Sequence, residues 1–224
     1  FACLGLNMMT HRDEPMHVYG PPGTREILSH LITACDIPQA IGFGVPGQTL
    51  PHPRDFIVCR DIRPGEVVEI DAIQISCCEN THYRAEDKFG EDGPISLSYR
   101  FNAPDRSMVF TGDTGPCRAL EVLAEGADLL VGELIDADII VNRLRTQKQE
   151  MSEQAIQKMR QHFTEHHLTP EDLGELAARA GVKQVVATHI PFMTKSAEQD
   201  AEYVIRISAK FAGGVSISED LGEY

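Results

Sequence analysis

Segments with the pattern of β-strands alternate with segments of helical pattern along most of this chain, and this alternation is what most restricts its fold. "IQISC" alternates apolar and polar residues, "SLSYRF" does the same, and the short apolar runs "MVF", "DLLV" and "QVVA" follow. Helical patterns lie between or after them, at about 117–126, 152–163, 169–181 and 196–211. "GVSI" is expected to form a last strand at the edge of the sheet. This order predicts a layered α/β fold.

Two of the predicted helices carry specific expectations. In the helix that follows "HL", Thr169 is the expected N-cap, Pro170 occupies the first position and Gly181 ends the helix. Near the start of the chain, "TREILSHLITA" is expected to bury one apolar side, made of Ile27, Leu28, Leu31 and Ile32.

Three polar residues come just after predicted strands. His82 follows "ISCCENT", Asp113 follows "MVFTG", and His189 follows "VVAT". In α/β proteins the ends of strands gather ligand sites, and imidazole and carboxylate groups are common zinc ligands. A carboxylate can also bridge two metals. The alternatives are ordinary ones: a turn aspartate that bonds its own backbone, and histidines hydrogen-bonded within loops.

A second pair of candidate residues lies at the same kind of position. Glu133 ends the strand "DLLVGE", and His167 precedes the capped helix in "HHLTPEDL". A glutamate and a histidine beside a metal can relay a proton to a leaving group. Alternatively, Glu133 is a loop acid and His167 packs over the entrance of the helix.

Composition excludes some classes of function. The chain has 20 Lys and Arg residues against 34 Asp and Glu residues, a net charge of −14, so a protein that holds nucleic acid by charge alone is disfavoured. No apolar run approaches the roughly 20 residues of a membrane span. The six cysteines form no CxxC pair, which suggests buried thiols and slightly favours the cytoplasm, although localisation stays unknown.

The stretches "SYRF…RSMVFTGDTGPCRALEVLAEGADLLVGELID" and "HHLTPEDLGELAARAGVKQVVATHIP" resemble the metallo-β-lactamase superfamily, in its ribonuclease Z and arylsulfatase-like branch. The likeness runs from "YGPPG" onward and keeps the family order of motifs. It implies an αββα sandwich with two zinc ions. By position, His82 and His189 match metal ligands and Asp113 the bridging carboxylate. Glu133 and His167 match the residues thought to act as a proton shuttle.

Two departures from the family pattern qualify this resemblance. The HxHxDH segment, which supplies four ligands in the family, does not occur in these 224 residues. We therefore expect a metallo-β-lactamase-like domain over residues 1–224 that lacks the first part of its fold. The second departure is Gly132, where ribonuclease Z has a histidine; together with the net charge of −14, it argues against tRNA processing.

The resulting hypothesis is a metal-dependent, di-zinc hydrolase that uses metal-bound hydroxide on a small ester-type substrate: a sulfate ester, a phosphodiester or a lactone. The alternatives are a tRNA 3′-processing endonuclease of the ribonuclease Z type and a non-catalytic partial domain. The expected partner is a small molecule, with neither nucleic acid nor membrane. Because one face of the sheet is built to be covered, either upstream residues or a second copy in a homodimer is expected to cover it.

Overall fold

The computed structural model describes residues 2–9, 14–47, 49–83, 93–147, 151–191 and 196–224. The chain divides into two compact units, Phe1–Arg63 and Pro64–Tyr224, and each has a hydrophobic core of its own. The expectation of one domain over residues 1–224 stays a prediction. Within the described ranges, no helix is both long and apolar enough to cross a membrane.

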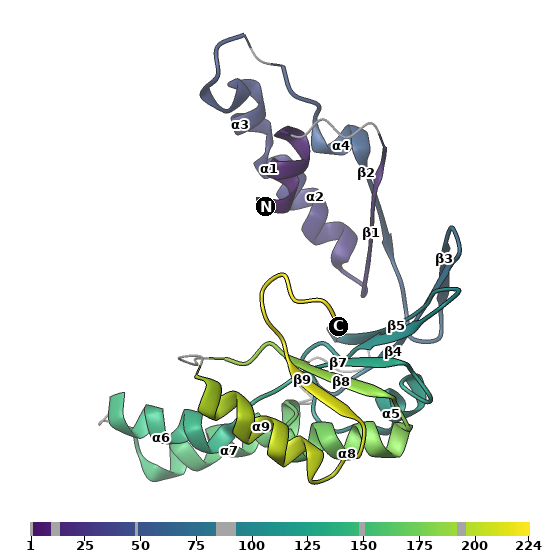
Figure 1. Ribbon diagram of the computed structural model, residues 1–224. Coiled ribbons are helices and arrows are strands. Elements are labelled where there is room, and N and C mark those ends of the chain that lie inside the picture. Colours follow the sequence, from purple (N-terminus) through teal and green to yellow (C-terminus); the bar gives the residue numbers. More distant parts are fainter. Residues whose placement is uncertain (1, 10–13, 48, 84–92, 148–150, 192–195) are drawn as a thin grey trace. The chain divides into compact units, whose positions relative to one another are not determined.

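The first unit combines a pair of parallel strands with short helices around a small core (Figure 1). Its elements are α1 (Ala2–Met9), β1 (Met16–Gly20), α2 (Thr24–Ala34), α3 (Asp36–Ala40), the 3₁₀ turn η1 (Gly42–Gly44), α4 (Pro53–Phe56) and β2 (Ile57–Asp61). Leu4, Cys35 and Phe56 are buried at its centre. The predicted helix is α2, but Ile27 is 63% exposed and only the other three apolar residues pack against this core.

The second unit is built on one seven-stranded sheet whose strands follow each other in chain order. The strands are β3 (Val67–Ile70), β4 (Ile73–Glu79), β5 (Leu97–Asn102), β6 (Ser107–Phe110), β7 (Leu129–Glu133), β8 (Gln184–Thr188) and β9 (Gly214–Ile217). Pairing is antiparallel from β3 to β6 and parallel from β6 to β9. The helices are α5 (Arg118–Leu123), α6 (Ala137–Gln147), α7 (Glu153–His166), α8 (Pro170–Ala180) and α9 (Ala197–Ser208).

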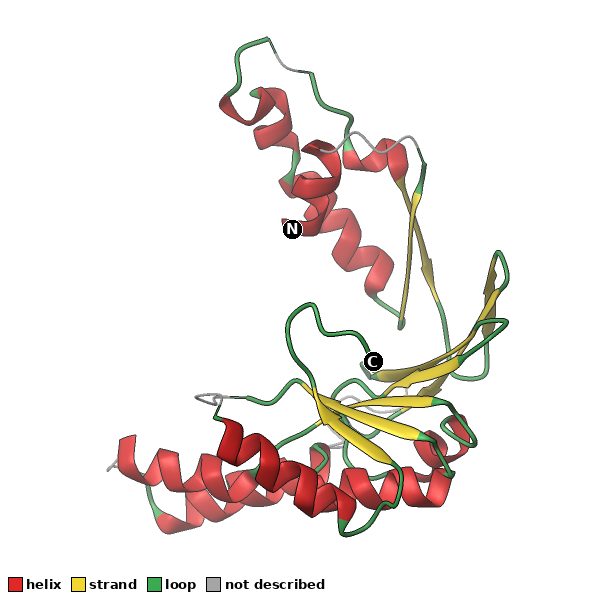
Figure 2. Ribbon diagram, in the orientation of Figure 1, coloured by secondary structure: helices red, strands yellow, loops and turns green. Residues whose placement is uncertain are grey.

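Helices α5, α8 and α9 lie over one face of this sheet (Figure 1, and in red in Figure 2). The main hydrophobic core lies between these helices and the sheet. A cross-strand row of Val109, Leu130 and Val185 supplies the sheet side, and all three are fully buried. Leu173 of α8 and Ile207 of α9 close the layer from the helix side. Burial of such side chains contributes roughly 1.5–3 kcal/mol each. The sheet's parallel half is therefore held rigidly, and this is the half whose strand ends carry the candidate site.

The start and end of α8 agree with the sequence-based expectation. Thr169 Oγ1 accepts a hydrogen bond from the Asp172 amide at 3.1 Å, and the Asp172 carboxylate accepts one from the Thr169 amide at 3.2 Å. This reciprocal capping box, with Pro170 at the first position, satisfies two backbone donors of the first turn. Gly181 ends the helix in the left-handed conformation, with φ of +64°. The helix therefore begins directly after the His167 segment, at a fixed place.

The opposite face of the sheet is also apolar. Tyr99, Phe110 and Val131 occupy one cross-strand row, and the rings of Phe101 and Phe110 meet edge to face at 5.6 Å. Phe110 is 40% exposed. The expectation that upstream residues or a second copy cover this face stays a prediction.

Candidate metal and proton-transfer site

The candidate residues gather at one edge of the sheet because the strands that carry three of them run parallel. Glu133 is the last residue of β7, His189 directly follows β8, and Asp113 lies three residues beyond the end of β6. The carboxyl ends of parallel strands meet at the same edge, where α/β proteins place their ligand sites. His82 reaches the same place from the turn after β4.

Asp113 lies between two histidines and presents a different oxygen to each. Its Oδ2 is 3.9 Å from Nε2 of His82, and its Oδ1 is 3.5 Å from Nε2 of His189. Both separations are longer than the 2.7–3.2 Å of ordinary N–H···O hydrogen bonds. The structure thus brings together all three residues that the sequence nominated as metal ligands. Their role as ligands stays a prediction.

The ring of His82 is oriented by a backbone carbonyl. Its Nδ1 lies 3.3 Å from the oxygen of His166, and a carbonyl oxygen can only accept, so Nδ1 carries the proton. In the neutral ring, Nε2, the atom that faces Asp113, is then the nitrogen with a free lone pair. His166 in turn contacts the Thr81 carbonyl oxygen through its own Nδ1 at 3.0 Å. A hydrogen bond of this kind on the far nitrogen is what fixes the tautomer of metal-binding histidines.

The backbone of His82 is held by a buried amide side chain. Asn80, only 1% exposed, accepts the His82 N–H at its Oδ1, at 3.2 Å. Its Nδ2 donates to Ser98 Oγ and to the carbonyl oxygen of Thr111, each at 3.2 Å. Asn80 thus ties the turn after β4 to the end of β6, two residues before Asp113. Sequence reasoning missed both Asn80 and His166. The only signals were a polar residue at a strand end and the doublet "HH".

Glu133 and His167 form a buried pair. His167 Nδ1 lies 3.0 Å from Oε1 and 2.9 Å from Oε2 of Glu133, whose side chain is 3% exposed. Glu133 Oε1 also accepts the Thr114 amide at 2.7 Å, one residue after Asp113. Burial lowers the pKa of His167, but the hydrogen bond to Glu133 and the negative charges of Glu133 and Asp113 outweigh it and raise that pKa. The pair can therefore hold a proton.

A glycine lets the two halves of the site approach each other. A Cβ atom on Gly115 would lie 1.9 Å from the carbonyl oxygen of Glu165, which is backbone and cannot rotate away. Gly115 belongs to the loop after Asp113, and Glu165 immediately precedes the two histidines that contact the site. The absence of a side chain at this position therefore sets how closely the two segments pack.

His189 has an uncommon backbone conformation, with φ of +51°. The left-handed region is unfavourable for a residue with a side chain, and such residues cluster at functional sites. Its side chain is 67% exposed. With this backbone conformation, its Nε2 lies 3.5 Å from Asp113 Oδ1.

The donor set fits zinc. In a tetrahedral shell with metal–ligand bonds of ~2.0–2.1 Å, neighbouring ligand atoms lie about 3.3 Å apart. The two nitrogen–oxygen separations at Asp113, 3.5 and 3.9 Å, are close to that spacing. His82, Asp113 and His167 also offer one ligand atom each within 4.8 Å of one another. The two groups share His82 and Asp113. His167 differs from His189 because its Nδ1 is already engaged by Glu133, which leaves only Nε2 available.

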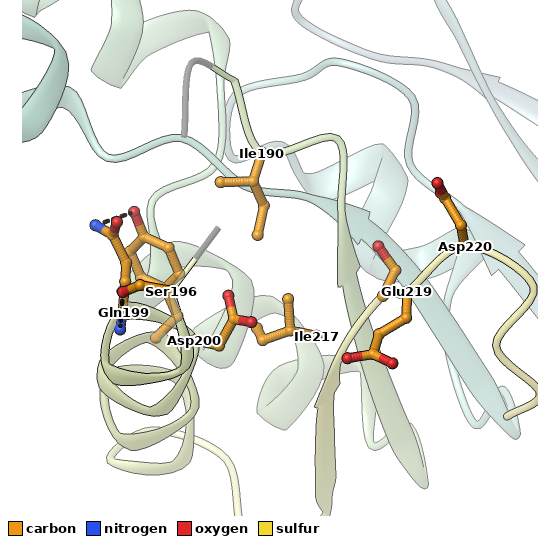
Figure 3. A pocket seen from close by; sticks show the side chains of 9 residues that line it. Ile190, Ser196, Gln199, Asp200, Ile217, Glu219 and Asp220 are labelled. Carbon is orange, nitrogen blue, oxygen red and sulfur yellow. Dashed lines mark hydrogen bonds between the residues drawn. The ribbon is translucent and has the colours of Figure 1, made fainter. Parts of the chain in front are cut away.

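A pocket of about 630 Å³ begins at the residue after His189. Figure 3 shows Ile190 and Ile217 on its wall, and the acidic side chains that line it, Asp200 from α9 and Glu219 with Asp220 from the segment after β9. Ser218, also in the wall, donates to Thr188 Oγ1 at 3.0 Å. The pocket is therefore attached to the strand end that carries His189.

Comparison of the sequence with known proteins assigns the chain to a family. The model of the beta-lactamase superfamily domain matches residues 2–190. Ribonuclease Z of Mycolicibacterium paratuberculosis is 27% identical over 217 residues, covering 96% of this chain and 69% of the relative. Ribonuclease Z of Mycobacterium sp. strain KMS is 28% identical, covering 92% and 65%. The chain thus spans about two thirds of the length of these curated relatives.

Solved structures agree on the fold. The metallo-beta-lactamase fold protein YhfI from Bacillus subtilis superposes with a TM-score of 0.63 at 15% identity, covering 98% of this chain and 69% of that one. The short form of human tRNase Z gives 0.55 at 14% identity, with 98% and 71% covered. Zn²⁺-bound PqqB from Methylobacterium extorquens gives 0.56 at 14%, with 96% and 67% covered. The predicted fold is confirmed, whereas the arylsulfatase-like part of the resemblance stays a prediction. The chain belongs to the beta-lactamase superfamily and is an enzyme of its metallo-β-lactamase-fold hydrolases.

Proposed function

We propose that this protein is a zinc-dependent hydrolase of small ester-type substrates, with a phosphodiester as the first class to test and sulfate esters and lactones after it. The observation that carries the proposal is Asp113, which offers one oxygen to His82 and the other to His189. A carboxylate with this placement can hold one metal with each histidine.

His82, Asp113 and His189 would hold the zinc, and two ions are expected. Zinc supplies a Lewis acid that lowers the pKa of a bound water and stabilises negative charge on the substrate. The hydrogen bond from His82 Nδ1 to the carbonyl of His166 leaves Nε2 of the neutral ring as the atom that would bind the metal. The orientation of this ligand therefore does not depend on the metal.

Glu133 and His167 would serve the leaving group. Glu133 accepts a hydrogen bond from Nδ1–H of His167, and its negative charge favours the charged imidazolium form of that ring. His167 Nε2 is then the atom that gives a proton to the departing oxygen. General acid catalysis of this type contributes roughly 10²–10⁴-fold to a rate.

The surroundings of His189 favour a small substrate. The adjoining pocket of about 630 Å³ has the size of pockets that hold small molecules. Its acidic lining, with the net charge of −14, disfavours a long polyanion, which proteins bind by placing Lys and Arg along its phosphates.

A second candidate function is tRNA 3′-processing, which the names of the relatives favour. The departure at Gly132 carries less weight against it than the sequence suggested. A Cβ atom at Gly132 would lie 2.4 Å from Leu173 Cδ1, on the core side of the sheet. The residue at this position is therefore limited by how it packs against Leu173 and not by contact with a substrate.

The test is hydrolysis by the full chain with added zinc of bis(p-nitrophenyl) phosphate, p-nitrophenyl sulfate, a simple lactone and a precursor tRNA. Asp113→Asn is expected to abolish turnover while the fold persists, because an amide cannot supply the bridging charge. Asp105→Asn, at an exposed acid outside the site, is the matched control. Salt-sensitive cleavage of the precursor tRNA with no turnover of the small esters would replace the proposal by the second candidate. Zinc content near zero, with no turnover of any substrate, would favour a non-catalytic domain.

A further inference from the structure

Arg206 of α9 joins two carboxylates that belong to different segments. Its Nη1 donates to Asp136 Oδ2 at 2.6 Å. Its Nε and Nη2 donate to the two oxygens of Glu171 at 2.7 and 2.8 Å, which is the bidentate geometry that only a guanidinium can supply. The Asp136 side chain is 6% exposed and that of Arg206 is 28% exposed. The network is therefore buried at its Asp136 end, whereas Glu171 is 42% exposed, and exposed Glu202 also approaches Nη1 at 4.0 Å.

Each carboxylate belongs to the segment that follows one member of the proton-transfer pair. Asp136 comes three residues after Glu133, and its Oδ1 accepts the amides of Asp138 and Ile139 at 3.1 and 3.0 Å, at the start of α6. Glu171 comes four residues after His167, in the first turn of α8. The guanidinium thus connects the residues just before α6 to the first turn of α8.

A backbone hydrogen bond joins the same two segments between the ion pair and the site. The amide of Ile135 donates to the carbonyl of Leu168 at 2.8 Å, and both residues are buried. Glu133 and His167 lie just on the site side of this bond, and Asp136 and Glu171 on the other side. The ion pair, the backbone bond and the Glu133–His167 contact therefore form three successive links between the same two segments.

We propose that Arg206 is a positioning residue for proton transfer: it clamps the segment after β7 to the first turn of α8, so that Glu133 and His167 keep their hydrogen bond. This inference rests on the proposed function of that pair. The hydrogen bonds of the guanidinium go to Asp136 and Glu171 and to none of the candidate metal ligands. A shift of about 1 Å in such a supporting segment is enough to reduce turnover on the order of 10²-fold.

The alternative is that Arg206 only stabilises the packing of the helices. The dependence of kcat on the leaving group distinguishes this structural role from a role in proton transfer. We would measure kcat and KM with zinc-loaded protein for aryl and alkyl phosphodiesters whose leaving groups range from p-nitrophenol to simple alcohols. In Arg206→Met, kcat should fall on the order of 10²-fold for the alcohols and less than about threefold for p-nitrophenol, which departs without a proton. KM should change little, and Arg206→Lys should recover part of the loss.

Arg179→Met is the matched control. Arg179 also bridges two carboxylates, Glu121 of α5 at 3.1 Å and Glu175 of α8 at 3.2 Å, but neither contact reaches the segment after Glu133 or the first turn of α8. Its leaving-group dependence should be that of the parent. An equal fall in kcat for every leaving group in Arg206→Met, or no fall for any, would overturn the proposal.

A second readout does not require activity or metal. Hydrogen exchange at the Ile135 amide should speed up at least about tenfold in Arg206→Met and stay unchanged in Arg179→Met, because the clamp keeps that bond to Leu168 closed. Unchanged exchange would also overturn the proposal. If Arg206→Met does not fold, Glu171→Gln, at a side chain 42% exposed, removes one arm of the clamp and should show the same pattern more weakly. Failure of the proposed function is separate: the parent would then hydrolyse none of the esters, whatever the exchange rates.

Discussion

Replacing Gly115 by alanine tests whether close approach of two segments builds the site. The added Cβ would lie 1.9 Å from the Glu165 carbonyl oxygen and 2.8 Å from its carbonyl carbon, with Thr81 Oγ1 at 3.1 Å. An ordinary contact needs about 3.4 Å, so the two backbones must separate by more than 1 Å. Overpacking of this kind costs about 1–3 kcal/mol, and the upper end applies because the obstacle is backbone.

The assay is urea denaturation of the Gly115→Ala protein beside Gly214→Ala. A Cβ on Gly214 meets only Gln184 Cγ at 3.6 Å, an ordinary contact, so this control should lie within about 0.5 kcal/mol of the parent. The displaced segment also carries His166 and His167. We therefore expect Gly115→Ala to lose zinc affinity and turnover as well as stability. Equal unfolding free energies for the two alanine variants would refute the steric reasoning.

Three further predictions concern packing, pH and reactivity. Leu173→Ala should lower the free energy of unfolding by about 2–5 kcal/mol in urea titrations, because Leu173 is fully buried. It should also relieve the clash expected in Gly132→Ala, so the double variant should lose less unfolding free energy than the sum of the losses in the two single variants. The pKa of Glu171 is lowered chiefly by its hydrogen bond to Arg206, so the stability it contributes is present above its ordinary pKa of 4.5 and is lost as pH falls through its folded pKa. The gap in unfolding free energy between the parent and Arg206→Met, measured by urea titration, should therefore shrink between pH 6 and pH 3. Burial raises the pKa of Cys78 to about 12, so iodoacetamide at pH 8 should label it on the order of 10³-fold more slowly than free cysteine, and labelling at a free-thiol rate would contradict that burial.

Much of the site was predictable because it depends on where strands end. The apolar runs before Asp113, Glu133 and His189 mark three strands, and parallel pairing of these strands is enough to bring their ends to one edge. The caps of α8 were readable for a similar reason, since Thr169 and Gly181 act on neighbouring backbone. In each case the signal lies within a few residues of the feature that it specifies.

Features that depend on distant residues were not predictable. Asn80 is an ordinary polar residue in the sequence, and only its contacts with residues 18 and 31 positions away make it a support for His82. Helix α6 was missed, and its start is set by Asp136, which the distant Arg206 holds in place. Ile27 was expected in the core because helical periodicity gives the apolar side of a helix but not what packs against it.

In strand β7, two successive residues serve different purposes, one in core packing and the other in the candidate site. Successive side chains of a strand point to opposite faces, so Gly132 faces Leu173 in the helix layer while Glu133 faces His167 in the site. A change at position 132 should therefore act through the core, with effects on stability that are the same for every substrate. A change at position 133 should impair the transfer of a proton from His167 to the leaving group. The loss of kcat should therefore grow as the leaving group becomes more basic. Differences between this chain and ribonuclease Z at position 132 consequently bear on how α8 packs. Under the proposed function, we expect the choice of substrate to depend on the residues at the strand ends and in the acidic pocket beside them.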